Sequence, residues 1–336
     1  MAQLLGFIIL SFFVTGILLF PFIGFLYKIK FKRQHQETKD FLNNRAHVFD
    51  MFNSWKVGTP FGGGILIIIV VTLLTLWAYG MFGIDVGGWD LFAIFFTFIG
   101  FGLLGLYDDI KKLTNGNKNA LFGLRIRHKF AIQVALALII ATALYFKLGY
   151  SFLFISGIGL APIGLLFIPF AAIVIVSFAN AFNVTDGLDG LASGLFLICL
   201  LAFLSISANQ VKPALGIFIA MLSGSVAAFL YFNIYKARIW LGDVGSLSLG
   251  ASLAVIGLLN GKVIALAVIG GVFIIEIGSS LIQILGKKFL KRKIFPVAPL
   301  HLYLLKRGWE EPKIVMRAWL IGFMFATLGL YIAFIR

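Results

Sequence analysis

Two adjacent carboxylates, Asp108 and Asp109, stand just before a pair of lysines, Lys111 and Lys112. Neighbouring carboxylates repel each other unless a cation neutralises them. Mg²⁺ is the expected cation, because it prefers oxygen ligands and binds one or two carboxylates together with substrate phosphates. This first acidic motif therefore predicts a magnesium and phosphate site. The alternative is a solvated acidic helix end that the two lysines balance.

A second polar motif runs from Asn180 to Gly190 and follows an apolar run. Asn180 and Asn183 are three residues apart, and Asp186 and Asp189 have the same spacing. Because residues three apart are neighbours on a helix, we expect one helical face to present all four side chains. Polar groups at membrane depth are costly and usually functional. An ordinary loop with helix-capping side chains is the alternative.

A third motif, from Trp240 to Ser246, places Asp243 at the start of a predicted helix. The N-terminus of a helix attracts phosphate oxygens, and the carboxylate is also suited to a shared metal. Simple capping of the helix by Asp243 is the alternative. Trp240 is suited to stacking on a base or to anchoring the chain at the membrane interface, and taken alone the anchor is favoured.

Basic side chains and flexible backbone accompany these acids. Lys56 opens a glycine-rich segment, up to Gly64, in which phosphate can approach backbone N–H groups. Lys129 lies among several basic residues, for which a plain cytoplasmic charge bias is the alternative. The loop around His301 alternates apolar and basic residues and predicts an amphipathic stretch on the membrane surface. For Glu276, inside an apolar run, hydrogen bonds that pack helices together are favoured.

The elements that must position these residues are membrane spans. The chain is 61% hydrophobic and 12% charged, whereas soluble domains have about 25% charged residues. A span needs roughly 20 apolar residues. We predict ten spans, at about residues 4–27, 62–82, 90–106, 130–147, 163–180, 191–208, 213–232, 245–260, 262–286 and 316–335. The fold class is therefore an all-α polytopic membrane protein, with residues 1–336 forming one integral-membrane domain.

The basic residues fall on one side of this arrangement. With ten spans, both termini share one side, and the other side holds the loops 28–61, 107–129, 181–190, 233–244 and 287–315. These five loops, with Arg317 at their edge, contain 24 of the 28 lysines and arginines. The positive-inside rule makes this side cytoplasmic and puts both termini outside. The same face holds all five carboxylates of the three acidic motifs, so we expect the five loops to form the active site.

Such a face is suited to phosphoryl chemistry, in which a metal and lysines offset the charge of diphosphate oxygens. At the membrane interface it can join a water-soluble anionic donor to a lipid acceptor.

Topology and attraction to anionic lipid explain most of the net charge of +15. No basic segment forms a separable module for nucleic acid. A secondary transporter is the alternative class, but its polar residues lie at the membrane midplane, where this chain has only Glu276.

These motifs resemble those of the polyprenyl-phosphate N-acetylhexosamine-1-phosphate transferase superfamily, and within it the phospho-N-acetylmuramoyl-pentapeptide transferase (MraY) family. The resemblance runs in order from Lys56 to Arg317. The aspartate pair, the Asn180–Gly190 motif and the Gly242–Ser246 motif match the superfamily. The segment from Lys56 to Gly64 resembles the first loop of the narrower family. The segment from Ala298 to His301, followed by Gly308 to Lys313 with Glu311, resembles its last loop.

The resemblance implies transfer of phospho-MurNAc-pentapeptide from UDP-MurNAc-pentapeptide to undecaprenyl phosphate, giving lipid I and UMP for peptidoglycan synthesis. It implies Mg²⁺, a homodimer and a place in the bacterial cytoplasmic membrane. Asp243 and Asp186 would hold the metal, and Asp108 or Asp109 would position or deprotonate the lipid phosphate. Lys112 and Lys129 would offset the charge of the phosphates, and Asn183 would orient the diphosphate. Lys56, Asp189 and Trp240 would line the uridine pocket. Asn180 and His301 would be further substrate contacts.

The last loop departs from the family's pattern. Where the family usually has three successive histidines, this chain has His301, Leu302 and Tyr303. The contacts that select the sugar or peptide of the donor therefore stay open. A sister enzyme that uses UDP-GlcNAc or a related UDP-sugar is the alternative. Direct attack and an aspartyl intermediate are both open as mechanisms.

Overall fold

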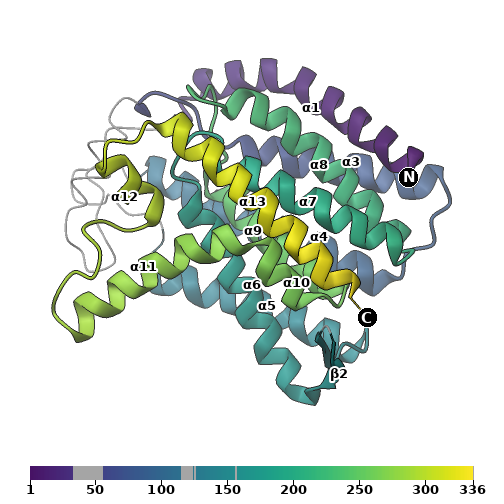
Figure 1. The fold of residues 1–336 in the computed structure, drawn as a ribbon. Helices are drawn as coiled ribbons and strands as arrows, with labels where there is room; N and C mark the ends of the chain where they lie inside the picture. The colour runs from purple at the N-terminus through teal and green to yellow at the C-terminus, as the bar shows by residue number, and fades with distance from the viewer. Residues whose placement is uncertain (33–55, 115–123, 125, 156, 336) are drawn as a thin grey trace.

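The computed structural model describes residues 1–32, 56–114, 124, 126–155 and 157–335. Helices make up most of this part of the chain (Figure 1). They are α1 (Ala2–Lys28), α3 (Gly63–Met81), α4 (Gly88–Thr114), α5 (Ile126–Phe146), α6 (Phe167–Thr185), α7 (Leu191–Asn209), α8 (Pro213–Asn233), α9 (Gly242–Leu259), α10 (Val263–Ile269), α11 (Gly271–Phe289), α12 (Leu300–Lys306) and α13 (Glu311–Phe334). A short antiparallel hairpin, β1 (Phe152–Ile155) and β2 (Gly159–Pro162), and the 3-10 turn η2 (Gly164–Leu166) precede α6. Most of the predicted loop 28–61 lies outside the described residues.

The helices confirm the prediction of an all-α polytopic membrane protein. Nine of the described helices are long and apolar enough to cross a membrane, and a tenth span results if α10 and α11 are counted together. The two chain ends lie at the same side of the molecule (Figure 1). Which side of the membrane the ends face stays a prediction.

The ninth predicted span is not a single straight helix. Its two halves, α10 and α11, meet at Gly270 with a bend of 76°. The hydropathy of the run 262–286 did not reveal this bend, because both halves are apolar. The bend aims α11 away from the bundle and toward α12 (Figure 1).

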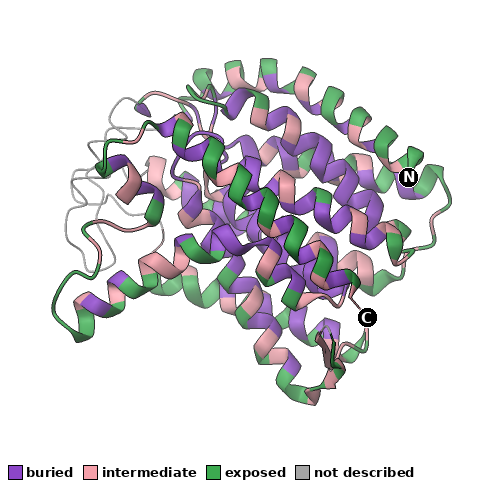
Figure 2. Cartoon of the chain, viewed as in Figure 1, coloured by how far each residue is buried: buried purple, intermediate pink, exposed green. Residues whose placement is uncertain are grey.

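Helices α8 and α9 form the centre of the bundle. In α9, every residue from Val244 to Leu259 is buried, whereas α1 and α13 turn many exposed apolar side chains outward (Figure 2). A helix that is apolar on all sides is suited to burial among other helices. The first turn of α9, which contains Asp243, is therefore continuous with a helix that is buried along its length.

Close packing against α3 and α4 fixes the start of α9. A Cβ atom built on Gly64 of α3 would lie 2.3 Å from the Cα atom of Gly245, and one built on Gly105 of α4 would lie 2.2 Å from the carbonyl oxygen of Asp243. Small residues allow membrane helices to approach each other this closely. The backbone around Asp243 is thus held between two neighbouring helices.

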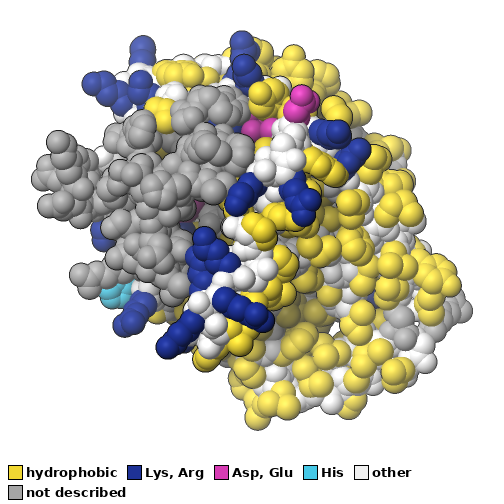
Figure 3. Space-filling view, turned by 60° about the vertical axis from the view of Figure 1, so that its left-hand side comes forward, with side chains coloured by type: hydrophobic (Ala, Val, Ile, Leu, Met, Phe, Trp, Pro, Cys, Tyr) yellow, Lys and Arg dark blue, Asp and Glu magenta, His cyan; other side chains and the backbone are white. Residues whose placement is uncertain are grey.

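Basic side chains gather on one part of the surface. In Figure 3, lysine and arginine side chains lie in the left and central parts of the view, while hydrophobic side chains cover most of its right-hand side. Exposed basic residues of the last predicted loop include Lys288, Lys291, Arg292, Lys306 and Arg307. This segregation agrees with the charge asymmetry of the sequence.

Candidate active site

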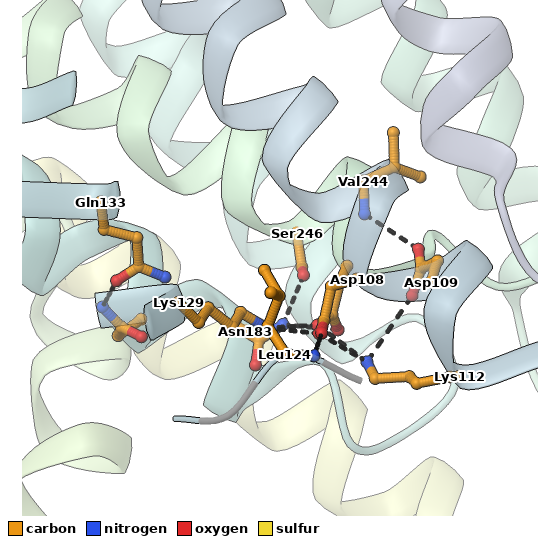
Figure 4. Close-up of polar contacts among 11 residues, drawn as sticks. Asp108, Asp109, Lys112, Leu124, Lys129, Gln133, Asn183, Val244 and Ser246 are labelled. Atoms are coloured by element: carbon orange, nitrogen blue, oxygen red, sulfur yellow. Dashed lines mark hydrogen bonds and ion pairs between the residues drawn. The ribbon is translucent and has the colours of Figure 1, made fainter. Parts of the chain in front are cut away.

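Asp243 lies at the centre of a polar cluster whose other members, Asp108, Asp109, Lys112, Lys129 and Asn183, are among the residues labelled in Figure 4. Its Oδ2 accepts hydrogen bonds from Lys112, at 2.8 Å, and from Lys129. Asn183 donates to Oδ1 at 3.1 Å. The alternative that Asp243 simply caps α9 is wrong, because the cap position is Leu241 and the Asp243 side chain binds Lys112, Lys129 and Asn183. Since α4, α5 and α6 each supply one partner, the cluster forms where four helices meet.

The adjacent carboxylates of α4 have different partners. Asp108 Oδ2 lies 3.1 Å from the ammonium groups of both Lys112 and Lys129. Asp109 Oδ2 accepts the backbone N–H of Val244 at 3.1 Å, and its Oδ1 lies 3.6 Å from Lys112. Both carboxylates are almost fully buried, so the alternative of a solvated acidic helix end is wrong. Asp108 faces the lysines of the cluster, and Asp109 ties α4 to the start of α9.

The two amides of α6 point to different neighbours. Besides Asp243, Asn183 Nδ2 donates to Ser246 Oγ at 2.7 Å. Asn180 Nδ2 donates to Gln133 Oε1 of α5 at 2.7 Å (Figure 4). Asn183 is therefore a member of the charged cluster, whereas the described contacts of Asn180 join α6 to α5.

The turn after α6 holds the remaining acids. Because α6 ends at Thr185, the prediction that one helical face presents all four polar side chains is wrong for Asp186 and Asp189. At Gly190, where α7 begins, φ is +77°, a conformation that glycine adopts without strain. Burial raises the pKa of the Asp186 carboxyl to about 7, and the negative charge of Asp243 contributes to this rise.

A second charged cluster surrounds Lys56, which is 1% exposed. Its Nζ lies 3.2 Å from Asp189 Oδ1, 2.6 Å from Glu311 Oε1 and 4.6 Å from the ring centroid of Trp240. The structure thus brings together the three residues predicted for a uridine pocket. The contact with Lys56 favours a role for Trp240 in the site over a purely anchoring one. Sequence reasoning gave Glu311 no role in the site, although it follows Glu310 in an otherwise basic loop and lies within the segment that resembles the family.

His301 lies inside the protein, on α12. Its Nδ1 is 3.0 Å from Glu276 Oε2, which is the interhelical hydrogen bond predicted for Glu276. A Cβ atom on Gly187 would lie 2.5 Å from His301 Nε2, so the imidazole packs directly on the turn after α6. Leu302 is also buried, and the hydroxyl of Tyr303 accepts a hydrogen bond from Arg307 Nε at 2.8 Å.

The end of the glycine-rich segment, where α3 begins, forms hydrogen bonds with the protein's own backbone. The N–H of Gly63 donates to the carbonyl of Trp240 at 2.9 Å, and that of Gly64 donates to the carbonyl of Leu241 at 3.0 Å. The prediction that phosphate approaches the backbone here is therefore wrong for these two N–H groups. Instead they attach the segment that leads to Asp243 to the first turn of α3.

The carboxylates offer suitable chemistry for Mg²⁺, although the part of the chain that the structure describes contains no complete ligand set. Among the described residues, no three acidic, histidine or cysteine side chains are grouped as a metal site. Asp243 and Asp186 provide the hard oxygens that Mg²⁺ prefers, and this ion commonly takes further ligands from substrate phosphates. The residues thus fit the ion by donor type, and magnesium dependence stays a prediction.

Comparison of the sequence with known proteins identifies the family of the chain. The family model described as Glycosyl transferase family 4 matches residues 91–261. A phospho-N-acetylmuramoyl-pentapeptide-transferase of Geobacillus sp. (strain WCH70) is 36% identical over 97% of this chain and 96% of the relative. The protein of the same name from Bacillus pumilus is 33% identical over 98% of this chain and 98% of the relative. The one from Chloroflexus aggregans is 38% identical over 83% of this chain and 78% of the relative. The chain therefore belongs to the phospho-N-acetylmuramoyl-pentapeptide-transferase family.

Proposed function

We propose that the protein transfers phospho-MurNAc-pentapeptide from UDP-MurNAc-pentapeptide to undecaprenyl phosphate, releasing UMP and forming lipid I. The observation that supports this most strongly is the meeting of Asp108, Asp243, Lys112 and Lys129 at the ends of membrane-spanning helices. Paired lysines beside carboxylates suit a reaction in which phosphate charge must be offset. We place the reaction at the cytoplasmic face of the bacterial cytoplasmic membrane, where the basic loops are predicted to lie.

In the proposed reaction, an oxygen of the lipid phosphate attacks the β-phosphorus of the donor. The new P–O bond forms while the bond from this phosphorus to the bridging oxygen breaks, and UMP leaves with that oxygen. Asp108 or Asp109 positions the attacking phosphate and accepts its proton if one is present. Lys112 and Lys129, which link Asp108 to Asp243, are placed to turn toward the phosphate oxygens and offset their charge.

We further propose that Asp243 and Asp186 hold Mg²⁺. When bound, the ion would neutralise charge on the donor diphosphate. We expect EDTA to abolish turnover and added Mg²⁺ to restore it. Full activity in the presence of EDTA would contradict this assignment without affecting the identity of the substrates.

The donor is tested by offering each UDP-sugar separately to purified protein in detergent with Mg²⁺ and undecaprenyl phosphate. We expect UMP release with UDP-MurNAc-pentapeptide and none with UDP-GlcNAc. The second candidate, a sister enzyme that uses UDP-GlcNAc, rests on Leu302 and Tyr303 at positions where the family usually has histidine. UMP release with UDP-GlcNAc alone would establish that candidate and overturn the first.

Two further proposals concern the mechanism and assembly. Direct attack predicts that no radiolabelled phospho-sugar becomes attached to the protein when the lipid acceptor is left out, whereas an aspartyl intermediate predicts such an adduct.

The homodimer is tested by the molecular mass of the detergent-solubilised protein. Membership of a transferase family favours this chemistry over secondary transport.

A further inference from the structure

Glu311 is remote in sequence from the three acidic motifs, but it lies among their residues in space. Its Oε1 accepts a hydrogen bond of 2.6 Å from Lys56 Nζ, a residue 255 positions away. The same oxygen accepts the backbone N–H of Asp189 at 2.7 Å. Glu311 is 8% exposed. One buried carboxylate oxygen thus holds both a charged side chain and a backbone group of the predicted uridine pocket.

Both partners of Glu311 depend on a buried acceptor. Lys56 is buried, and a buried ammonium requires negative partners to offset the loss of water. The Asp189 N–H is also buried, and such a group is costly to leave without an acceptor. The side chain of Asp189 is itself engaged, because Oδ1 lies 3.2 Å from Lys56 and Oδ2 accepts the N–H of Ala237 at 2.9 Å. The position of each member is therefore fixed by the others.

Other residues near the end of the chain support the same turn after α6. Trp319 Nε1 of α13 donates to the carbonyl of Gly190 at 3.2 Å. The ring of His301 on α12 packs against Gly187. Together with Glu311, these side chains bring α12 and α13 against the turn that contains two of the predicted functional acids. Glu311 differs from the other two because it also binds the lysine of the pocket.

We propose that Glu311 is a positioning residue of the donor site, which fixes Lys56 and Asp189 in the arrangement that receives the uridine nucleotide of the donor. It acts through these two residues and has no direct contact with the substrate. Because Lys56 lies 4.6 Å from the ring centroid of Trp240, displacement of Lys56 also changes the aromatic surface offered to a base. The inference rests on the proposed function and adds a residue to it.

The test variant is Glu311→Gln, which retains the shape of the side chain and an oxygen for the Asp189 N–H but removes the negative charge beside Lys56. We expect KM for UDP-MurNAc-pentapeptide to rise about tenfold or more, as for loss of a charged hydrogen bond. We expect kcat and KM for undecaprenyl phosphate to stay within about twofold, because these bonds do not reach the Asp243 cluster. The matched control is Glu310→Gln, at an exposed neighbouring position, and it should leave all three constants unchanged.

A positioning role through Lys56 also predicts non-additivity. The double variant Glu311→Gln with Lys56→Gln should have a donor KM close to that of Lys56→Gln alone, because coupled residues do not add. Full additivity of the two changes would contradict action through Lys56. A donor KM that stays at the wild-type value in Glu311→Gln, with only the thermal unfolding midpoint lowered, would reduce Glu311 to a structural residue and overturn the proposal.

A second variant keeps the test decisive if Glu311→Gln does not fold. Glu311→Asp retains the charge but is shorter by one methylene group, so it should weaken donor binding while keeping kcat. A wild-type donor KM in Glu311→Asp would then overturn the proposal. Failure of the proposed function looks different, because the wild-type protein would then release no UMP from UDP-MurNAc-pentapeptide.

Discussion

The two charged clusters of this protein each contain a residue of α6 or of the turn that follows it, and each contains a residue near the start of α9, yet they differ in exposure. In the Asp243 cluster, the side chains of Lys112 and Lys129 are 31% and 18% exposed. In the Lys56 cluster, the side chains of Lys56 and Asp189 are 1% and 0% exposed. Partly exposed lysines can exchange a carboxylate for an incoming phosphate, whereas a lysine buried between two carboxylates is held in place. We propose from this comparison that the Asp243 cluster is the reacting centre and that the Lys56 cluster is a preformed part of the donor site.

The clusters also differ in how the chain assembles them. The Asp243 cluster draws one to three side chains from the end of each of four helices, α4, α5, α6 and α9. The Lys56 cluster joins the segment before α3, the turn after α6 and the first turn of α13. A change in the first cluster should therefore affect chemistry with little effect on folding. A change in the second should affect both donor binding and stability.

The largest effect is expected for Asp243→Asn. The neutral amide binds a divalent cation more weakly than a carboxylate does, and it no longer attracts the two lysines and Asn183 as a charged acceptor. We expect kcat to fall by about 10³-fold or more, the scale seen when a residue essential to chemistry is removed. A thermal unfolding midpoint close to the wild-type value would show that the fold is intact. Substantial turnover by this variant would break the assignment of the reacting centre.

The next largest effect is expected for Lys129→Met. Lys129 contacts both Asp108 and Asp243, so its loss removes a positive charge from the place where phosphate charge is to be offset. We expect kcat/KM to fall by about 10²-fold, with little change in the unfolding midpoint because the side chain is partly exposed. Lys111→Met is the control, since Lys111 lies on the same helix as Lys112 but against the ring of Tyr107. An equal loss in the control would indicate a general charge effect.

A smaller effect on activity, with a larger effect on stability, is expected for Lys56→Gln. The substitution leaves Asp189 and Glu311 buried without their ammonium partner, which costs about 3 kcal/mol or more in a buried pair. We expect the unfolding midpoint to fall and the donor KM to rise about tenfold, while kcat is largely kept. A loss of kcat as large as that of Asp243→Asn would erase the distinction between the two clusters.

The smallest effect on activity is expected for Gly64→Ala, which tests the packing that positions both clusters. The added Cβ atom would meet the backbone of Gly245 at 2.3 Å, so α3 and α9 must separate slightly. We expect a loss of stability of about 1–3 kcal/mol and only a few-fold loss of activity. Gly6→Ala is the matched control, because a Cβ atom there meets nothing within 4 Å. A stability equal to wild type in Gly64→Ala would show that this crossing is not tight in solution.

Much of the fold and part of the site were predictable from the sequence, because the relevant signals are local. Long apolar runs specify the spans, and acids next to span ends predicted that Asp108 and Asp243 meet. The turn after α6 was predicted as a continued helical face, which is wrong because the helix ends at Thr185. Spacing alone does not show where a glycine-containing motif stops being helical.

Features that depend on distant contacts were not predictable from one sequence. The bond between Lys56 and Glu311 joins residues at the two ends of the motif series, and no local pattern relates them. The bend at Gly270 is hidden because both halves of the span are apolar. Gly63 and Gly64 looked suited to phosphate, but their N–H groups are engaged by the backbone of residues 240–241. Each of these outcomes is decided by tertiary packing.

The distinction between a reacting centre and a binding surface is tested most directly by UMP binding measured without divalent cations, in parallel with turnover. Asp243→Asn should bind UMP with an affinity within about twofold of the wild type while releasing no product. Lys56→Gln should bind UMP about tenfold more weakly and still turn over at high donor concentration. The opposite pattern, with UMP binding lost in Asp243→Asn and unchanged in Lys56→Gln, would contradict the assignment of the two clusters.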